Sequence, residues 1–122
     1  MRKRIVAGNW KMNMNNSDAH ALFESLNNAK IVNSTEIIVA PPSVYLSDFA
    51  SNKNKNIYLA AQNCSDNENG AYTGEISASM LSSIGVEYCL VGHSERRQYQ
   101  NESDLLIKQK INVLLENKVI PI

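Results

Sequence analysis

The sequence predicts a parallel α/β fold, and two features of the chain carry that prediction. Strand-like runs recur roughly every 20 to 30 residues, and each is followed by a segment with helical spacing of its apolar residues. Parallel strands require such crossover segments, whereas antiparallel strands are joined by short turns. In addition, two clusters of polar residues stand directly after strand-like runs, where parallel α/β proteins carry functional groups.

The first two strand–helix units come before residue 50. The run 4–6 is a short strand, and Asn16 or Ser17 then caps a helix. The apolar positions of that helix follow i, i+3, i+4, i+7 spacing and are Ala19, Leu22, Phe23 and Leu26. The run 36–40 is almost entirely apolar, as in strands buried on both faces, and two prolines end it before a short helix at 44–48.

Two further units follow. The run 57–61 is the third strand, and after a polar loop a helix is expected at 77–84, with Gly85 as its C′ residue. The run 87–91 is the fourth strand.

The chain ends in helical segments and the beginning of another strand. One helix is expected to start just after His93, and an apolar stripe predicts a second helix at 103–117. Residues 119–122 begin a fifth strand. The polar loop at 63–74 is longer than most connections, which favours a functional role for it.

Composition excludes some partners. The 122 residues carry 12 Lys and Arg against 12 Asp and Glu, so no global field attracts nucleic acid or an anionic membrane. No apolar run approaches the ~20 residues of a membrane span, and no secretory leader is recognisable, so we expect a cytoplasmic protein. Cys64 and Cys89 lack metal-type spacing and are expected to be small buried groups.

Residues 91–99 form the most informative motif, with the letters VGHSERRQY. A helix that starts just after His93 points its free backbone N–H groups at the imidazole. Those groups disfavour the charged imidazolium form, so the neutral ring remains as a hydrogen-bond donor that can polarise a carbonyl. Taken alone, such a motif is more often a histidine satisfied at a strand end beside an exposed Glu-Arg-Arg group.

Residues 7–13 and two parts of the segment 62–77 favour the functional interpretation of His93 over the structural one. Residues 7–13 have the letters AGNWKMN and also follow a strand, while residues 62–64 and 70–77 have the letters QNC and GAYTGEIS. In this order, and together with residues 91–99, they closely resemble the triosephosphate isomerase family. The resemblance extends over essentially all 122 residues.

The resemblance implies a (β/α)8 TIM barrel. Such barrels typically need about 250 residues, so residues 1–122 are interpreted as the N-terminal half of a single barrel domain, with strands 1–4, their helices and the start of strand 5. The spacing of the strands alone also fits a doubly wound sheet. No Gly-x-Gly-x-x-Gly follows the first strand, which weakens a dinucleotide-binding version of that fold.

The activity implied by the resemblance is interconversion of dihydroxyacetone phosphate and glyceraldehyde 3-phosphate, as in glycolysis and gluconeogenesis. Protons move through an enediolate, and neither a metal nor an organic cofactor takes part. His93, Lys11 and Glu95 are the implied catalytic residues, and Asn9 and Lys11 bind the substrate. Glu95 either orients Lys11 or moves a proton.

Supporting and dimer residues are also implied. Ser94 receives the resting catalytic carboxylate, and Arg96 and Arg97 act mainly as structural ion-pair partners. The complete enzyme is a homodimer in which the loop 63–77 contacts the neighbouring subunit. The expected dimer contacts are Met12, Tyr72, Thr73 and Gly74.

One departure from the family pattern leaves alternatives open. The family's general base lies in a Tyr-Glu-Pro-Val-Trp segment after the sixth strand, and no such segment occurs in these residues. The chain alone is therefore expected to be inactive. It could instead be a non-catalytic half-barrel that self-associates or pairs with a separate C-terminal half. A third interpretation is another phosphate-binding barrel enzyme, such as a sugar-phosphate epimerase. The lack of metal-ligand histidines at the strand ends argues against it.

Overall fold

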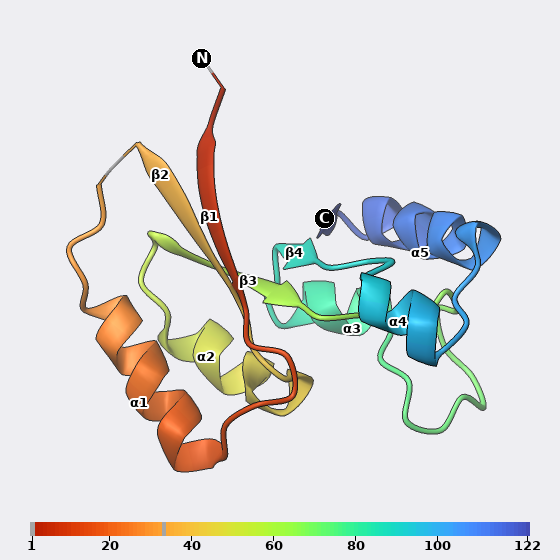
Figure 1. Ribbon diagram of the computed structural model, residues 1–122, viewed down its shortest axis with the longest axis horizontal. Helices are drawn as coiled ribbons and strands as arrows, with labels where there is room; N and C mark the ends of the chain where they lie inside the picture. The colour runs from red at the N-terminus through yellow and green to blue at the C-terminus, as the bar shows by residue number, and fades with distance from the viewer. Residues whose placement is uncertain (1, 33) are drawn as a thin grey trace.

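The computed structural model describes residues 2–32 and 34–122, whose strands form one parallel sheet in the order β1-β2-β3-β4-β5. The strands are β1 (Arg4–Asn9), β2 (Thr35–Ala40), β3 (Ile57–Ala61), β4 (Tyr88–Cys89) and β5 (Ile120–Pro121). A doubly wound sheet reverses its strand order, whereas a barrel keeps the order of the sequence. The sheet curls as in the first half of a (β/α)8 barrel (Figure 1).

The two faces of the sheet carry different clusters, because alternate residues of a strand point to opposite sides. Val39, Leu59 and Cys89 face the helices and belong to the larger core. Ile38 and Tyr88 belong to a smaller cluster on the concave face. The helical segments are α1 (Asn16–Asn27), the 3-10 helix η1 (Ser43–Tyr45), α2 (Leu46–Asn52), α3 (Ala78–Ser83), α4 (Ser94–Tyr99) and α5 (Asp104–Glu116).

Two predictions about the helices were wrong and one is confirmed. Asn15 caps α1, since its Oδ1 accepts a hydrogen bond from the Asp18 N–H at 3.1 Å, so the prediction of Asn16 or Ser17 was wrong by one or two residues. The helix expected at 44–48 is divided into η1 and α2. Gly85 follows α3 with φ +84°, as predicted for a C′ glycine.

The first and fourth strands differ most from their predicted lengths, each by three residues. β1 continues to Asn9 because the backbone of its last three residues stays in register with β2, with Asn9 opposite Ala40. β4 is limited to two residues, although the Leu90 N–H still donates to the Ala61 carbonyl at 2.8 Å and the Val91 N–H to the Ile122 carbonyl at 3.0 Å. Pairing with β2 thus makes the first strand longer than predicted, and the regular pairing of the fourth strand is limited to Tyr88 and Cys89.

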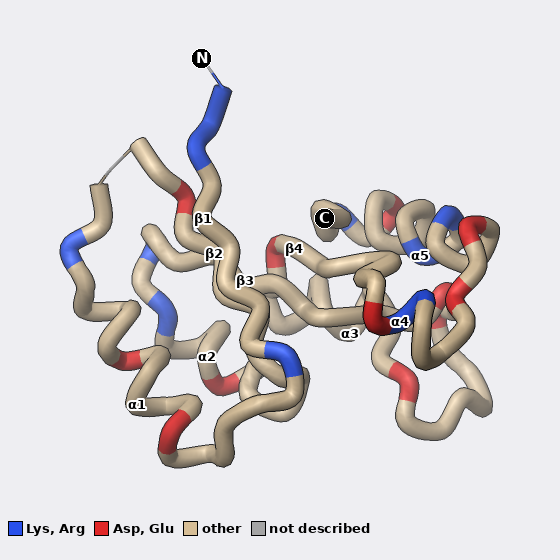
Figure 2. Tube along the Cα trace, viewed as in Figure 1, with Lys and Arg blue, Asp and Glu red and all other residues tan. Residues whose placement is uncertain are grey.

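Charged residues of both signs are interspersed along the chain (Figure 2). His20 on α1, to which the sequence assigned no role, forms an ion pair with Asp48 on α2 and packs edge-on against Phe49. The hydrogen bond that the His20 ring donates to the Asp48 carboxylate raises the pKa of His20 above its ordinary value. This contact joins the two outer helices that stand side by side in Figure 1.

Candidate functional site

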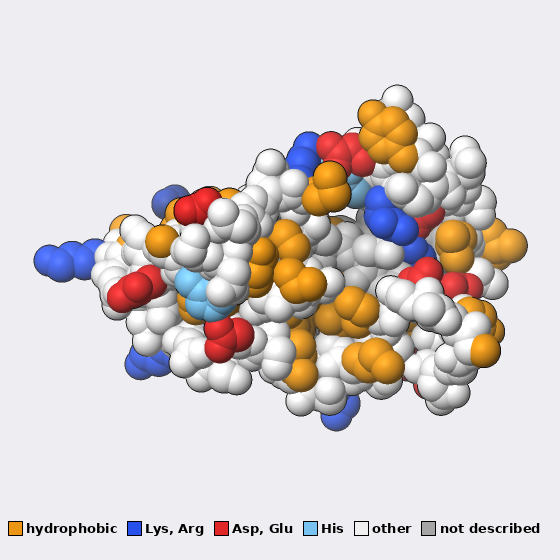
Figure 3. All heavy atoms as spheres, turned by 90° about the horizontal axis from the view of Figure 1, so that it is seen from below, with side chains coloured by type: hydrophobic (Ala, Val, Ile, Leu, Met, Phe, Trp, Pro, Cys, Tyr) orange, Lys and Arg blue, Asp and Glu red, His pale blue; other side chains and the backbone are white. Residues whose placement is uncertain are grey.

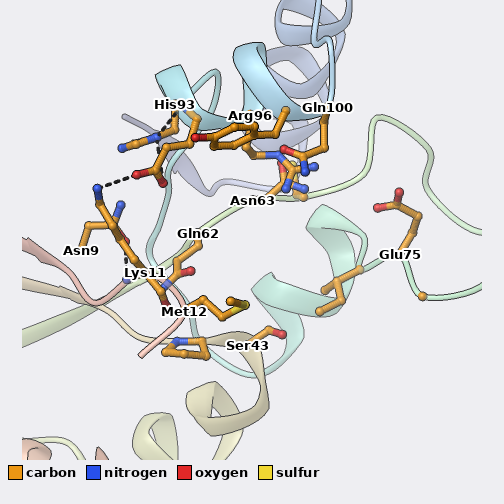
Figure 4. Close-up of a pocket in the computed structure, with 16 residues that line it drawn as sticks. Asn9, Lys11, Met12, Ser43, Gln62, Asn63, Glu75, His93, Arg96 and Gln100 are labelled. Atoms are coloured by element: carbon orange, nitrogen blue, oxygen red, sulfur yellow. Dashed lines mark hydrogen bonds and ion pairs between the residues drawn. The ribbon is translucent and has the colours of Figure 1, made fainter. Parts of the chain in front are cut away.

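A cavity of about 620 Å³ opens where the carboxyl ends of β1 to β4 meet. In a parallel barrel this is the edge that carries functional groups. Figure 3 looks onto this face and shows hydrophobic side chains beside a recess bordered by charged ones. Figure 4 shows Asn9 and Lys11 at the left of the cavity with His93 above them, and Gln62 beside Lys11.

His93 reaches the cavity through a tight turn after β4. Gly92 has φ +65°, and a Cβ on it would come within 2.8 Å of Ile107 Cδ1 on α5, so only glycine allows this approach. His93 then caps α4, and its Nδ1 accepts the Glu95 N–H at 3.1 Å. That bond assigns the proton of a neutral ring to Nε2, which makes Nε2 a hydrogen-bond donor.

Lys11 stands two residues beyond β1 in an unusual backbone conformation, with φ +54°. Its N–H donates to Asn9 Oδ1 at 2.9 Å, which closes the loop locally. Its ammonium lies 2.6 Å from Glu95 Oε1, and both side chains are about half exposed. The loop therefore presents a cation at the mouth of the cavity.

Glu95 joins the two sides of the cavity. One carboxylate oxygen pairs with Lys11, and the other lies 3.6 Å from His93 Nδ1. The hydrogen bond and the charge of Lys11 hold the pKa of Glu95 below its ordinary value. Glu95 is therefore ionised at neutral pH, and its partners keep it in place.

Behind the cavity lies a buried ionic cluster, of which the sequence analysis anticipated only Arg96 as an ion-pair partner. Glu102 accepts hydrogen bonds from Lys110 Nζ at 2.6 Å and from Arg96 Nε at 3.0 Å. Lys110 Nζ also donates to Asn63 Oδ1 at 2.8 Å. Burial alone would raise the pKa of Glu102, but the hydrogen bond and charge of Lys110 together with Arg96 outweigh it, so the pKa lies below its ordinary value.

The structure brings most of the expected site residues together. The residues of that set that line the cavity are Asn9, Lys11, Met12, Gly74, His93, Glu95 and Arg96. Ser94 is exposed at the start of α4, and Tyr72 and Thr73 lie on the exposed part of the loop 63–77, outside the cavity lining. Arg97 pairs with Asp104 at 2.7 Å.

The sequence analysis missed three residues around the site, and one of them left a readable signal. Lys110 lies three residues after Ile107 and four before Leu114, on the buried face of α5. A lysine within such an apolar stripe implies a buried partner of opposite charge. Glu102 and Gln62 gave no comparable signal, because their partners are brought to them by the fold.

Chemically, the cavity combines a cation, an imidazole N–H donor, an amide and an ionised carboxylate. Such a set is chemically suited to an anionic oxygen ligand and to charge that develops on it. Within residues 2–32 and 34–122, no group of three His, Cys, Asp or Glu side chains is placed to hold a metal ion. Over the same residues, no helix has both the length and the apolar character that a membrane span requires.

Comparison with known proteins agrees with this arrangement. The family model described as Triosephosphate isomerase matches residues 4–122. A triosephosphate isomerase of Porphyromonas gingivalis is 42% identical over 126 residues, covering all of this chain and 50% of the relative. A triosephosphate isomerase of Neurospora crassa is 44% identical over 119 residues, covering 97% of this chain and 48% of the relative.

The fold and the cavity define half of a (β/α)8 barrel with a polar site at the carboxyl ends of its strands. The chain belongs to the triosephosphate isomerase family. It spans about half the length of the curated relatives that it matches.

Proposed function

We propose that this chain supplies the electrophilic half of a triosephosphate isomerase active site, in a cytoplasmic enzyme of glycolysis and gluconeogenesis. The reaction interconverts dihydroxyacetone phosphate and glyceraldehyde 3-phosphate through an enediolate. The observation that carries the proposal is the convergence of Asn9, Lys11 and His93 on one cavity of a chain that belongs to this family.

Each of these residues has a role in the proposed reaction. The ammonium of Lys11 attracts the anionic substrate and stabilises the enediolate charge, and the amide of Asn9 donates to a substrate oxygen. His93 donates from Nε2 and polarises the carbonyl, the arrangement established for triosephosphate isomerase. Glu95 holds Lys11 in position through the 2.6 Å contact.

The general base belongs to the other half of the proposed barrel. Glu95 is engaged by Lys11, and Glu75 lies across the cavity from His93 (Figure 4). The family resemblance assigns the base to a segment after the sixth strand, and the curated relatives are about twice as long as this chain. Activity is therefore expected only when both halves are present.

A non-catalytic role is the second candidate. All six residues of β1 are exposed, and Ile120 and Ile122 at β5 are about half exposed. Unpaired strand edges of this kind favour association with another sheet. On this reading the half-barrel self-associates or pairs with a separate C-terminal half and does no chemistry of its own.

A completed barrel tests the isomerase proposal. Residues 1–122 are joined to the second half of the Porphyromonas gingivalis relative, and isomerisation of dihydroxyacetone phosphate is measured. We expect turnover, and we expect His93→Gln to lower kcat by about 100- to 10,000-fold because the proton donor and acceptor is lost. His20→Gln, the other histidine of the chain, is the matched control and keeps its rate. Unchanged turnover in His93→Gln would remove the proposed role of His93.

We also infer that the complete protein is a homodimer that uses the loop 63–77. Met12 is almost fully exposed and Tyr72 is about half exposed, and buried aromatic anchors dominate protein interfaces. Tyr72→Glu is expected to shift the completed barrel from dimer to monomer in sedimentation velocity. Leu105→Glu, at an exposed apolar position on α5, is the control. Equal dimer content in both variants would rule out this use of the loop.

A further inference from the structure

Lys11 is held in a conformation that non-glycine residues rarely adopt. Its φ of +54° lies in the left-handed region, which persists only when the surroundings fix it. Two side chains do so from either side of the residue. Asn9 Oδ1 accepts the Lys11 N–H, and Gln62 Nε2 donates to the Lys11 carbonyl, both at 2.9 Å.

Gln62 makes this contact from a third strand. It is the first residue after β3, and the same Nε2 also donates to the carbonyl of Ala40, the last residue of β2, at 2.8 Å. A side-chain amide nitrogen carries two hydrogens, so these two bonds use both. Gln62 therefore joins the loop after β1 to the end of β2, and its amide nitrogen has no hydrogen left for a substrate.

We propose that Gln62 is the positioning residue that keeps Lys11 in its left-handed conformation and so keeps the ammonium against Glu95 at the cavity mouth. The effect on turnover rests on the proposed isomerase function, whereas the effect on the Lys11 backbone does not. The chemistry of the position is restrictive, because two carbonyl oxygens face one nitrogen. A carboxylate would repel both oxygens, and an apolar side chain would leave both without this donor.

Two variants of the completed barrel test the proposal. Gln62→Met keeps the length of the side chain and removes both donors, and we expect kcat/KM to fall by about 100-fold through misplacement of Lys11. Hydrogen exchange at the Lys11 amide is expected to accelerate, while the amides of β3 stay protected. Gln109→Met, an exposed glutamine on α5, is the matched control.

Gln62→Glu adds a pH signature. The protonated carboxyl donates one hydrogen bond and the carboxylate none, so the Lys11 amide is expected to be better protected at low pH, relative to the unsubstituted protein. A double variant separates positioning from general support of the fold. In a Lys11→Met background, Gln62→Met should lower kcat/KM no further, because a residue that acts through Lys11 has nothing left to position.

The results decide between this role and a purely structural one. Unchanged exchange at the Lys11 amide in both Gln62 variants would overturn the proposal, as would losses of kcat/KM that multiply in the double variant. If the completed barrel itself shows no turnover, the proposed isomerase function fails. The exchange of the Lys11 amide, measured in that same protein, still decides whether Gln62 holds Lys11.

Discussion

Replacing Lys11 by methionine in the completed barrel is expected to lower kcat/KM by about 100- to 1,000-fold with little change in melting temperature. The ammonium is half exposed and supports no core packing, so its loss removes electrostatic stabilisation of the proposed enediolate and little else. Steady-state kinetics and thermal unfolding of the same samples measure the two effects.

The control for this prediction is Lys108→Met, an exposed lysine on α5. It removes the same charge at a distance from the cavity. If Lys11→Met keeps a near-normal kcat/KM, the cation at the cavity mouth is not part of the chemistry. If both variants lose activity equally, the effect is one of net charge.

Replacing Lys110 by methionine is expected to destabilise the completed barrel by about 3 to 5 kcal/mol, because it leaves a buried carboxylate without its closest cation. The side chains of Glu102 and Lys110 are only 2% and 5% exposed, which leaves little water to compensate. Denaturant unfolding measures the change. A second substitution, Glu102→Gln, is expected to recover part of the loss by removing the stranded charge.

The same pair predicts a direction for the pH dependence of stability. The folded-state pKa of Glu102 lies below its ordinary value of 4.5, so its stabilising contribution is present above that value and is lost as the pH falls through the lower, folded-state pKa. Lys110→Met should weaken this acid dependence. Lys108→Met, two positions away and exposed, is expected to leave both stability and acid dependence unchanged.

The elements of this fold were predictable where local chemistry alone decides them. β3 has the predicted bounds because its five residues are apolar and lie between polar segments, and Ser103 caps α5 as the end of an apolar stripe suggests. The shift of the α1 cap from the predicted Asn16 or Ser17 to Asn15 has a tertiary cause. Several neighbouring residues can cap this helix equally well. Asn15 does so because the preceding loop is fixed by the Tyr45 hydroxyl, which donates a hydrogen bond to the Met14 carbonyl.

Curvature of the sheet was not readable from strand spacing. Barrels and doubly wound sheets share that spacing, and the family motifs decided between them. Contacts between residues distant in sequence were equally hidden. Gln62 reaches Lys11 across 51 positions and Lys110 reaches Asn63 across 47, so neither contact leaves a local pattern. Strand-end motifs such as that of His93 can still be predicted from the sequence, because one short segment contains both the end of the strand and the start of the helix.

The measurement that tests the central claim most directly is complementation of the two halves. Residues 1–122 and the second half of the Porphyromonas gingivalis relative are assayed separately and mixed, with mass in solution recorded for each sample. We expect no turnover and self-association for residues 1–122 alone, because they lack the proposed general base and expose both sheet edges. Turnover is expected in the mixture and should be lost with His93→Gln. A monomeric, cooperatively unfolding 1–122 chain that isomerises triose phosphate by itself would contradict this account.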